Sequence, residues 1–191
     1  MMRSVTRTLC QQWIFTQGIF WVSTMLMAAA ANAEAPKISG QWPISGGGGW
    51  DYLTSDTKTS RLYVSRADHV DVLNTKNGNL IATITDTQGV HGFAIASNLK
   101  RGYISNGRTN SVTVFDLETF QKIQEISLNA QNPDAILYEP ISQQILTFNG
   151  RSQDVTVLDA QTLAVKATLK VPGKPEFAKS DEQGYVYVNI E

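Results

Sequence analysis

The sequence predicts an all-β fold, a β-propeller arc of about three and a third four-stranded blades, and two observations support this prediction. A similar stretch of about 40 residues recurs along the chain, with copies that start at Trp50, Val90, Pro133 and Pro175. Each complete copy contains four short runs rich in Val, Ile, Thr, Phe and Tyr, separated by turn residues, and no window carries a helical stripe. Four strands in a repeat of this length are typical of one propeller blade.

The second and third copies share the longest motif. The stretch "ISNGRTNSVTVFDLETF" (104–120) returns as "TFNGRSQDVTVLDAQTL" (147–163), 43 residues later. The alternation of apolar residues with Thr in V-T-V suits a sheet that is packed on both faces. A β-sandwich also contains many short strands, but it does not explain turn chemistry that returns at a fixed period, so we favour the propeller.

Strands are expected in each copy in the same order. Asn74, Asp116 and Asp159 follow the third strands, where an Asx side chain can bond the backbone ahead of it and close the turn to the fourth strand. The fourth strands are expected near residues 80–84, 122–127 and 164–169. The other strands are expected near residues 51–54, 61–65, 69–73, 92–96, 101–105, 111–115, 134–138, 144–148, 154–158 and 185–189.

Residues 1–33 have the features of a signal peptide. Arg3 and Arg7 precede an uncharged run over residues 13–31, and Ala31-Asn32-Ala33 is a small-x-small cleavage site. A transmembrane anchor is the alternative, but polar residues interrupt the run and the cleavage site ends it. We therefore expect an exported, periplasmic protein that has no membrane segment after cleavage.

Composition excludes several classes of function for the rest of the chain. Cleavage would remove Cys10, the only cysteine, so neither a disulfide nor a cysteine-bound zinc ion is expected. Without Arg3 and Arg7 the chain carries 14 basic and 17 acidic side chains, a net charge of −3. Because the basic residues form no cluster, a nucleic acid is an unlikely partner.

Residues 34–49 are predicted to hold an orphan strand and a linker. "KISGQWPI" (37–44) resembles a fourth strand without three strands before it, and Gly46 to Gly49 resemble a flexible linker. In closed propellers such a strand completes the last blade. Its partners would follow Glu191, so we expect a fragment of a longer propeller of seven blades, whose unpaired edges favour self-association.

The blade motifs also resemble a known family. "GGWDYL", "HVDVLN", "VHGFAIA", "SNGRTNSVTVFDLET", "NPDAILYEP" and "GYVYVNIE" together are similar to the exported YVTN-repeat, YncE-like seven-bladed propellers, over almost all of residues 50–191. The resemblance implies a periplasmic propeller that acts as a binding or repeat protein. More distant seven-bladed relatives include lactonases and the propeller parts of haem- or quinone-dependent dehydrogenases, so the fold does not define an activity.

Two sets of polar residues are predicted to meet on one face of the arc. One set starts the innermost strands, and the other lies in the loops between second and third strands. The first set is Asp51, His91, Asp134 and Glu176; the second is Arg66, Asn106, Arg108, Asn149 and Arg151.

These residues have a structural and a functional interpretation. In the structural interpretation the inner set caps strands, with Asp134 paired to Arg108 or Arg151, and each Asn-Gly is a turn that uses a positive φ at glycine. A planar guanidinium at a channel mouth also suits a carboxylate or phosphate, so we predict a small anionic ligand or a partner protein.

No catalytic residue, cofactor or metal is predicted. His69 and His91 do not form an H-x-x-x-H pair, no G-x-S-x-G serine is present, and Asp51, Asp134 and Glu176 suit a hard cation such as calcium only in a closed ring. The predicted function is an exported binding or scaffold propeller. The alternative is a propeller enzyme, either a lactone hydrolase or a subunit of a periplasmic redox complex.

Overall fold

The computed structural model describes residues 35–191, so the predicted signal peptide lies outside the described residues. The chain divides into two units, Met1–Gln41 and Trp42–Glu191. Residues 35–41 of the first unit are exposed and form neither helix nor strand. Among residues 35–191, no helix has the length and apolar character needed to cross a membrane.

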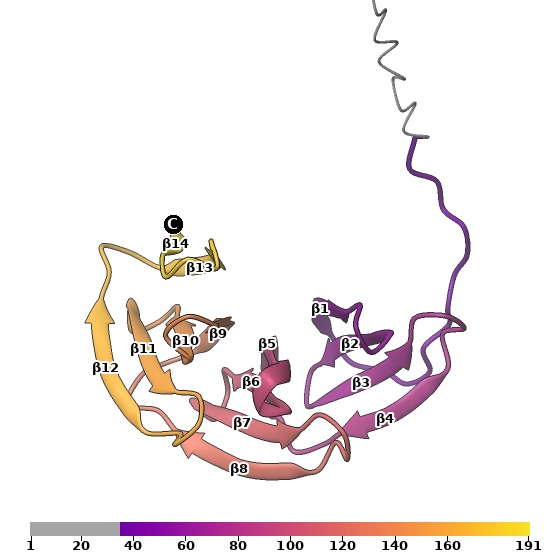
Figure 1. Cartoon of the computed structure of the whole chain (residues 1–191), viewed down its shortest axis with the longest axis horizontal. Coiled ribbons are helices and arrows are strands. Elements are labelled where there is room, and N and C mark those ends of the chain that lie inside the picture. The colour runs from indigo at the N-terminus through magenta and orange to yellow at the C-terminus, as the bar shows by residue number, and fades with distance from the viewer. Residues whose placement is uncertain (1–34) are drawn as a thin grey trace, which may run out of the picture. The chain divides into compact units, whose positions relative to one another are not determined.

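The second unit is an arc of antiparallel sheets, each formed by consecutive strands (Figure 1). Three sheets have four strands and the last has two, and we call them blades 1 to 4. Blade 1 contains β1 (Trp50–Asp56), β2 (Arg61–Arg66), β3 (His69–Asn74) and β4 (Leu80–Ile84). Blade 2 contains β5 (Val90–Ala96), β6 (Arg101–Asn106), β7 (Ser111–Asp116) and β8 (Lys122–Ser127), with the short 3-10 helix η1 (Ser97–Leu99) after β5. Blade 3 contains β9 (Pro133–Glu139), β10 (Gln144–Asn149), β11 (Asp154–Asp159) and β12 (Val165–Lys170), and blade 4 contains β13 (Pro175–Ser180) and β14 (Val186–Ile190).

The first strand of each blade lies on the concave side of the arc, and in blades 1 to 3 the fourth strand lies on the convex side (Figure 1). This arrangement confirms the all-β prediction and the order of strands within each copy. Strand β13 was not in the list of expected strands, although Glu176 was expected to start an innermost strand, because "PEFAKS" lacks the β-branched residues that mark the others.

The core lies between the blades. One cluster joins Tyr63 and Val72 of blade 1 to Phe93 and Phe115 of blade 2, with the rings of Tyr63 and Phe93 edge to face at 4.6 Å. A second cluster joins blade 2 to blade 3, and a third joins blade 3 to blade 4. Strand β7 contributes to two of these, because Val112 and Val114 face blade 3 whereas Phe115 faces blade 1.

Arginines at the start of β2 and β6 connect blade 1 to blade 2 and blade 2 to blade 3. Arg61, the first residue of β2, donates a hydrogen bond to the Leu117 carbonyl oxygen of blade 2. Arg101, the first residue of β6, donates in the same way to the Gln161 carbonyl oxygen of blade 3 at 2.7 Å. Each acceptor lies in the turn between the third and fourth strands, so these turns are part of the inter-blade contact.

The predicted Asx turns are confirmed. The Asp116 carboxylate accepts from the backbone N–H groups of Glu118 at 2.8 Å and Thr119 at 2.7 Å, and Asp159 accepts from Gln161 and Thr162 at 3.0 and 2.9 Å. In blade 1, Asn74 Oδ1 accepts from the N–H of Lys76 at 2.8 Å.

The strand predicted over residues 37–44 is absent from the structure, because no described strand pairs with this segment. The glycine-rich segment also differs from a free linker. The Arg66 guanidinium donates to the carbonyl oxygens of Gly46 at 3.0 Å and Gly47 at 3.2 Å, and the Ala67 N–H donates to Gly49 at 3.0 Å. Hydrogen bonds to its carbonyl oxygens therefore hold this segment against the end of β2.

We predict that Gly102→Ala destabilises the protein by about 1–3 kcal/mol, the usual cost of overpacking a core. A Cβ atom at Gly102 would lie 2.1 Å from Cζ of Phe115, whose fully buried ring covers the glycine from the paired strand. Chemical denaturation measures the effect. Gly47→Ala is the control, since a Cβ atom there meets nothing within 4 Å; equal stability of the two variants would contradict the prediction.

Candidate functional site

A β-bulge interrupts the first strand of each blade at the same place. The pairing shifts register between Trp50 and Leu53 in β1 and between Val90 and Phe93 in β5. Equivalent shifts follow Pro133 in β9 and Pro175 in β13. Bulges bend a strand and change the direction of its side chains. The first residue inside each bulge is Asp51, His91, Asp134 or Glu176. The predicted inner set is therefore a set of bulge residues.

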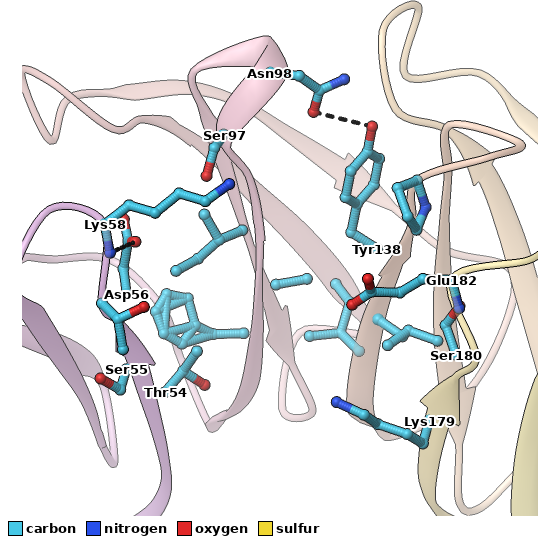
Figure 2. Close-up of a pocket in the computed structure, with 17 residues that line it drawn as sticks. Thr54, Ser55, Asp56, Lys58, Ser97, Asn98, Tyr138, Lys179, Ser180 and Glu182 are labelled. Carbon is cyan, nitrogen blue, oxygen red and sulfur yellow. Dashed lines mark hydrogen bonds between the residues drawn. The ribbon is translucent and has the colours of Figure 1, made fainter. Parts of the chain in front are cut away.

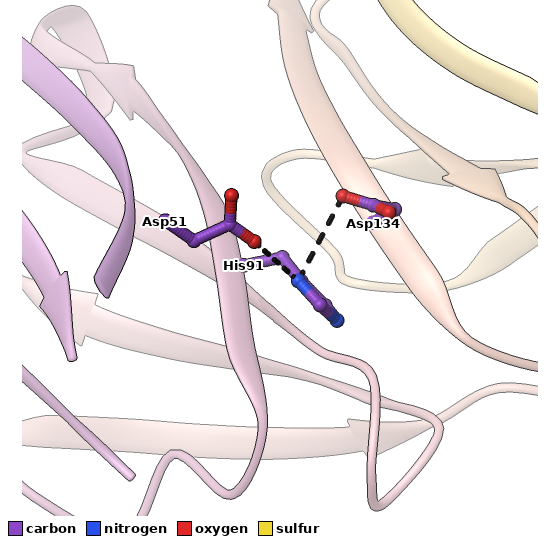
Figure 3. A group of neighbouring side chains, drawn as sticks. All are labelled: Asp51, His91 and Asp134. Carbon is purple, nitrogen blue, oxygen red and sulfur yellow. Dashed lines mark hydrogen bonds and ion pairs between the residues drawn. The ribbon is translucent and has the colours of Figure 1, made fainter. Parts of the chain in front are cut away.

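Three of these residues meet on the concave side of the arc (Figure 3). His91 Nδ1 lies 2.6 Å from Asp51 Oδ2 and 3.8 Å from Asp134 Oδ1, so one ring nitrogen faces two carboxylates from two different blades. The side chains of His91, Asp51 and Asp134 are 27%, 44% and 15% exposed. The site is thus open to solvent but walled by three successive inner strands.

Gly107 leaves the space in which the His91 ring lies. A Cβ atom at this position would be 2.6 Å from His91 Nε2 and 2.9 Å from Asn132 Oδ1. The glycine of the first Asn-Gly-Arg is therefore needed for close approach of the imidazole. The predicted positive φ is found instead at the end of each loop, at Asn110 and Gln153, whereas Gly107 and Gly150 lack it.

Glu176, the fourth residue of the inner set, is held by a lysine. Lys174 Nζ lies 2.7 Å from Glu176 Oε2 and 3.1 Å from Glu191 Oε2, and hydrogen bonds to these two carboxylates raise the pKa of the lysine. Sequence reasoning missed Lys174, although it lies only two residues before Glu176. Its charge is shared between these two partners.

Tyr52 extends the cluster between blades 1 and 4. Its hydroxyl donates to the Glu176 carbonyl oxygen at 3.5 Å. Burial, together with the negative charges of Asp134, Asp51 and Glu176, raises the pKa of Tyr52 to about 12, so the phenol stays protonated at neutral pH.

The pKa of Asp134 is raised above its usual value. Burial raises the pKa of its carboxyl group, and the charges of Asp51 and Glu176 raise it further, against the opposing effects of His91 and Lys174. No side chain among residues 35–191 donates a hydrogen bond to this carboxylate within the usual limits, and His91 at 3.8 Å is its ion-pair partner. The predicted pairing of Asp134 with Arg108 or Arg151 is not found.

Arg108 and Arg151 line a hollow of about 380 Å³, and His91 is part of its wall. Arg108 Nη1 lies 3.4 Å from Gln88 Oε1, and its charge also acts on the exposed carboxylate of Asp68. Within the described part of the chain, the Arg151 guanidinium makes no hydrogen bond or ion pair. The remaining lining residues are glycines and neutral amides: Gly89, Gly107, Asn110, Gln131 and Asn132.

The two asparagines of the loop set have a structural role. Asn106 and Asn149 are fully buried, which keeps them from a ligand. Asn149 Nδ2 donates to Asp154 Oδ1 and Thr156 Oγ1, both at 2.9 Å, and Asn106 Nδ2 donates to Ser111 and Thr113 at 3.1 and 2.8 Å. These bonds fasten the end of the second strand to the third and hold the loop between them.

The two networks differ in one acceptor. Asn149 Oδ1 accepts from Thr147 at 3.0 Å, whereas Asn106 Oδ1 has no partner in the described residues because Ile104 occupies the position that corresponds to Thr147.

Arg66, the remaining residue of the loop set, has a structural role as well. It is 5% exposed and lies 3.4 Å from Asp71, in addition to its bonds to the glycine-rich segment.

A larger cavity of about 770 Å³ lies at the other end of the inner strands (Figure 2). Its apolar wall includes Phe93, Ile95 and Ile136, and its rim includes Lys58 and Lys179. At one edge of the cavity the Tyr138 hydroxyl donates to Asn98 Oδ1 at 3.1 Å (Figure 2). The sequence analysis did not predict this cavity, because alternating apolar residues indicate burial but not the space left between strands.

Comparison with solved structures places the arc in a fold class. Hydrazine synthase of Kuenenia stuttgartiensis superposes with a TM-score of 0.70 at 16% identity, over 82% of this chain and 46% of that one. The U3-55K structure and the WD40 repeats of RRP9 each superpose with a TM-score of 0.62 at 12% identity. Each covers 69% of this chain, which spans 42% and 41% of their lengths.

These likenesses show a β-propeller fold, as the repeats predicted. The chain spans less than half the length of each of these structures. No protein-family model matches the sequence. No curated protein matches it either.

We predict that Asn149→Ala lowers the free energy of unfolding by about 1–3 kcal/mol, because it removes three buried hydrogen bonds, those with Thr147, Asp154 and Thr156. Urea denaturation measures the loss. Gln124→Ala removes an exposed amide from β8 and should leave stability unchanged. If Asn149→Ala were as stable as the parent protein but had lost ligand binding, Asn149 would be a ligand-binding residue and the prediction would be wrong.

Asp134→Asn should raise the melting temperature at pH 7. A carboxyl whose pKa is raised by folding stabilises the protein only while it is protonated, and this contribution is lost as the pH rises through the folded-state pKa. The gain over the parent protein should therefore shrink as the pH is lowered. Asp159→Asn should instead lower the melting temperature at pH 7, because hydrogen bonds from Lys166 and Thr162 lower the pKa of Asp159. Thermal melts from pH 3 to 8 on both variants test the pair of signs.

Proposed function

We propose that this protein is an exported binding propeller of the YVTN-repeat type, and that Arg108 and Arg151 hold a small anionic ligand in the hollow beside His91. The observation that carries the proposal is the Arg151 guanidinium, which has no partner among residues 35–191 and lines the same hollow as Arg108, although the two residues are 43 positions apart. Export is inferred from residues 1–33, and the YVTN-repeat type from the blade motifs.

The pairing of the arginines separates a structural role from a binding role. In a structural role each guanidinium would be neutralised by a nearby carboxylate, as Arg66 is by Asp71. Neither Arg108 nor Arg151 forms an ion pair within the usual distance among the described residues. Two planar donor groups beside a solvent-filled hollow suit a carboxylate or a phosphate group, which accepts bidentate hydrogen bonds.

The remaining wall favours the same class of ligand. Asn132, Asn110 and Gln131 are neutral, and no carboxylate lines the hollow. The Asn132 N–H donates to Asn110 Oδ1 at 2.9 Å, so the wall itself is held in place by a hydrogen bond. An anion would meet arginines and amide groups without facing a negative charge.

Arg151→Ala is predicted to weaken binding of a small anion by about 1.5–3 kcal/mol, the scale of a charge-assisted hydrogen bond, and to leave the melting temperature unchanged. Calorimetric titration with inorganic phosphate and with succinate gives both the affinity and the preferred head group. Arg151→Lys keeps the charge but not the fork, and it should recover only part of the affinity.

Lys122→Ala is the matched control, since it removes one positive charge from β8 on the convex side of the arc. If it weakens binding as much as Arg151→Ala, the effect is general electrostatics and the proposed site is wrong. A fall in melting temperature with unchanged affinity in Arg151→Ala would assign the arginine a structural role.

A further inference from the structure

The two histidines of the chain have different relations to the carboxylates around them. His69 Nδ1 lies 2.7 Å from Asp68 and its Nε2 lies 3.7 Å from Asp71, so opposite sides of that ring face separate carboxylates. In contrast, His91 presents a single atom, Nδ1, to both Asp51 and Asp134. Only the second arrangement directs one nitrogen and two oxygen ligands toward a common point.

We propose that Asp51, His91 and Asp134 bind a divalent first-row transition metal ion, with Zn²⁺ as the simplest probe. One ligand atom from each residue lies within 4.8 Å of the others. Ligands about 2.1 Å from a tetrahedral zinc ion are about 3.4 Å apart, so small side-chain rotations close the set around an ion. Three protein ligands leave a coordination position for water or a bound molecule.

The charge at this point favours a cation. Asp51 and Asp134 bring two carboxylates to one ring nitrogen, and Glu176 places a third carboxylate at the equivalent position of the next inner strand. The Lys174 charge is shared with Glu176 and Glu191, so it offsets these carboxylates only in part. A divalent ion would neutralise the two aspartates and would bind the Asp134 carboxylate directly, in place of its long ion pair with His91 at 3.8 Å.

The mixed donor set indicates which kind of ion fits. An imidazole with two carboxylates suits zinc, manganese or iron(II), whereas calcium prefers six or more oxygen ligands. Calcium would be expected to use Asp51, Asp134 and Glu176 and to leave the imidazole out. Binding of the two kinds of ion therefore depends differently on His91.

The scaffold around these ligands is rigid enough for a site. Each ligand is a bulge residue on an inner strand whose neighbours are paired, and the His91 ring is confined by Gly107. Asp134 also stands on β9, whose carbonyl oxygen at this residue accepts a hydrogen bond from the Ser105 hydroxyl of blade 2. The spacing between blades 2 and 3 is thereby fixed at the level of the ligands.

This inference goes beyond the proposed anion binding, and the two sites can be tested separately. The two aspartates meet His91 at Nδ1, whereas Arg108 and Arg151 belong to the hollow that His91 also lines and are not metal ligands. Arg151→Ala should therefore leave metal binding unchanged. Loss of both activities on this one substitution would contradict the separation of the sites.

The experiment titrates the intact, metal-free protein with Zn²⁺ by calorimetry and with Co²⁺ by visible absorption, in a Cys10→Ser background that removes the only thiol. We expect one ion per chain. His91→Ala and Asp134→Asn should each weaken binding by more than about 100-fold, since loss of a mere outer-shell partner already costs about 10- to 100-fold. Asp51→Asn, at a 44% exposed side chain, gives the same test with little risk to folding.

His69→Ala is the matched control, because it removes the other imidazole with two nearby aspartates and should leave affinity unchanged. Three results would overturn the proposal. They are the absence of Zn²⁺ binding, equal loss in the two histidine variants, and binding of Ca²⁺ in preference to Zn²⁺ with no dependence on His91. The first would mean that the cluster is an ion pair only, and the last would assign it to an oxygen-ligand site.

Discussion

Packing of each sheet against the next is the interaction on which the rest of this structure depends. The hydrogen bonds of a blade are satisfied within its own strands, so neighbouring blades are joined mainly by apolar side chains such as Tyr63, Phe93 and Phe115. The ring contacts and the arginine bonds at the turns set the distance and angle between successive sheets. The relative positions of the inner strands, and of every polar group they carry, follow from this packing.

The candidate sites exist only because several blades are combined. Asp51, His91 and Asp134 come from three different blades, and each is brought forward by the same irregularity of its strand. The arginine hollow likewise uses loops of two blades. A repeat architecture can thus make a heteroligand site from a motif that is nearly the same each time, because one position varies between Asp, His and Glu while the backbone around it is retained.

The sequence predicted the fold well and the site in part. Strand runs such as "VTVFD" and the Asx turns at Asp116 and Asp159 depend on local chemistry, which a sequence displays directly. The repeat position of His91 and the two aspartates predicted that they lie near one another. Their geometry could not be predicted, because the bulges depend on the register between two strands. The burial of Asn149 and Arg66 depends on tertiary packing. An arginine recurs at positions 61 and 101, and this recurrence is the sequence signal of the inter-blade contact.

The anchoring of the Asn-Gly-Arg loops has a consequence for how such a protein evolves. Because buried amide groups at Asn106 and Asn149 hold each loop from inside the sheet, the exposed side chain two residues later contributes little to folding. Substitution at positions 108 and 151 can then alter what the surface recognises while the scaffold is inherited unchanged. Gene duplication of such blades would supply many independent positions for adaptation, each with a small cost in stability.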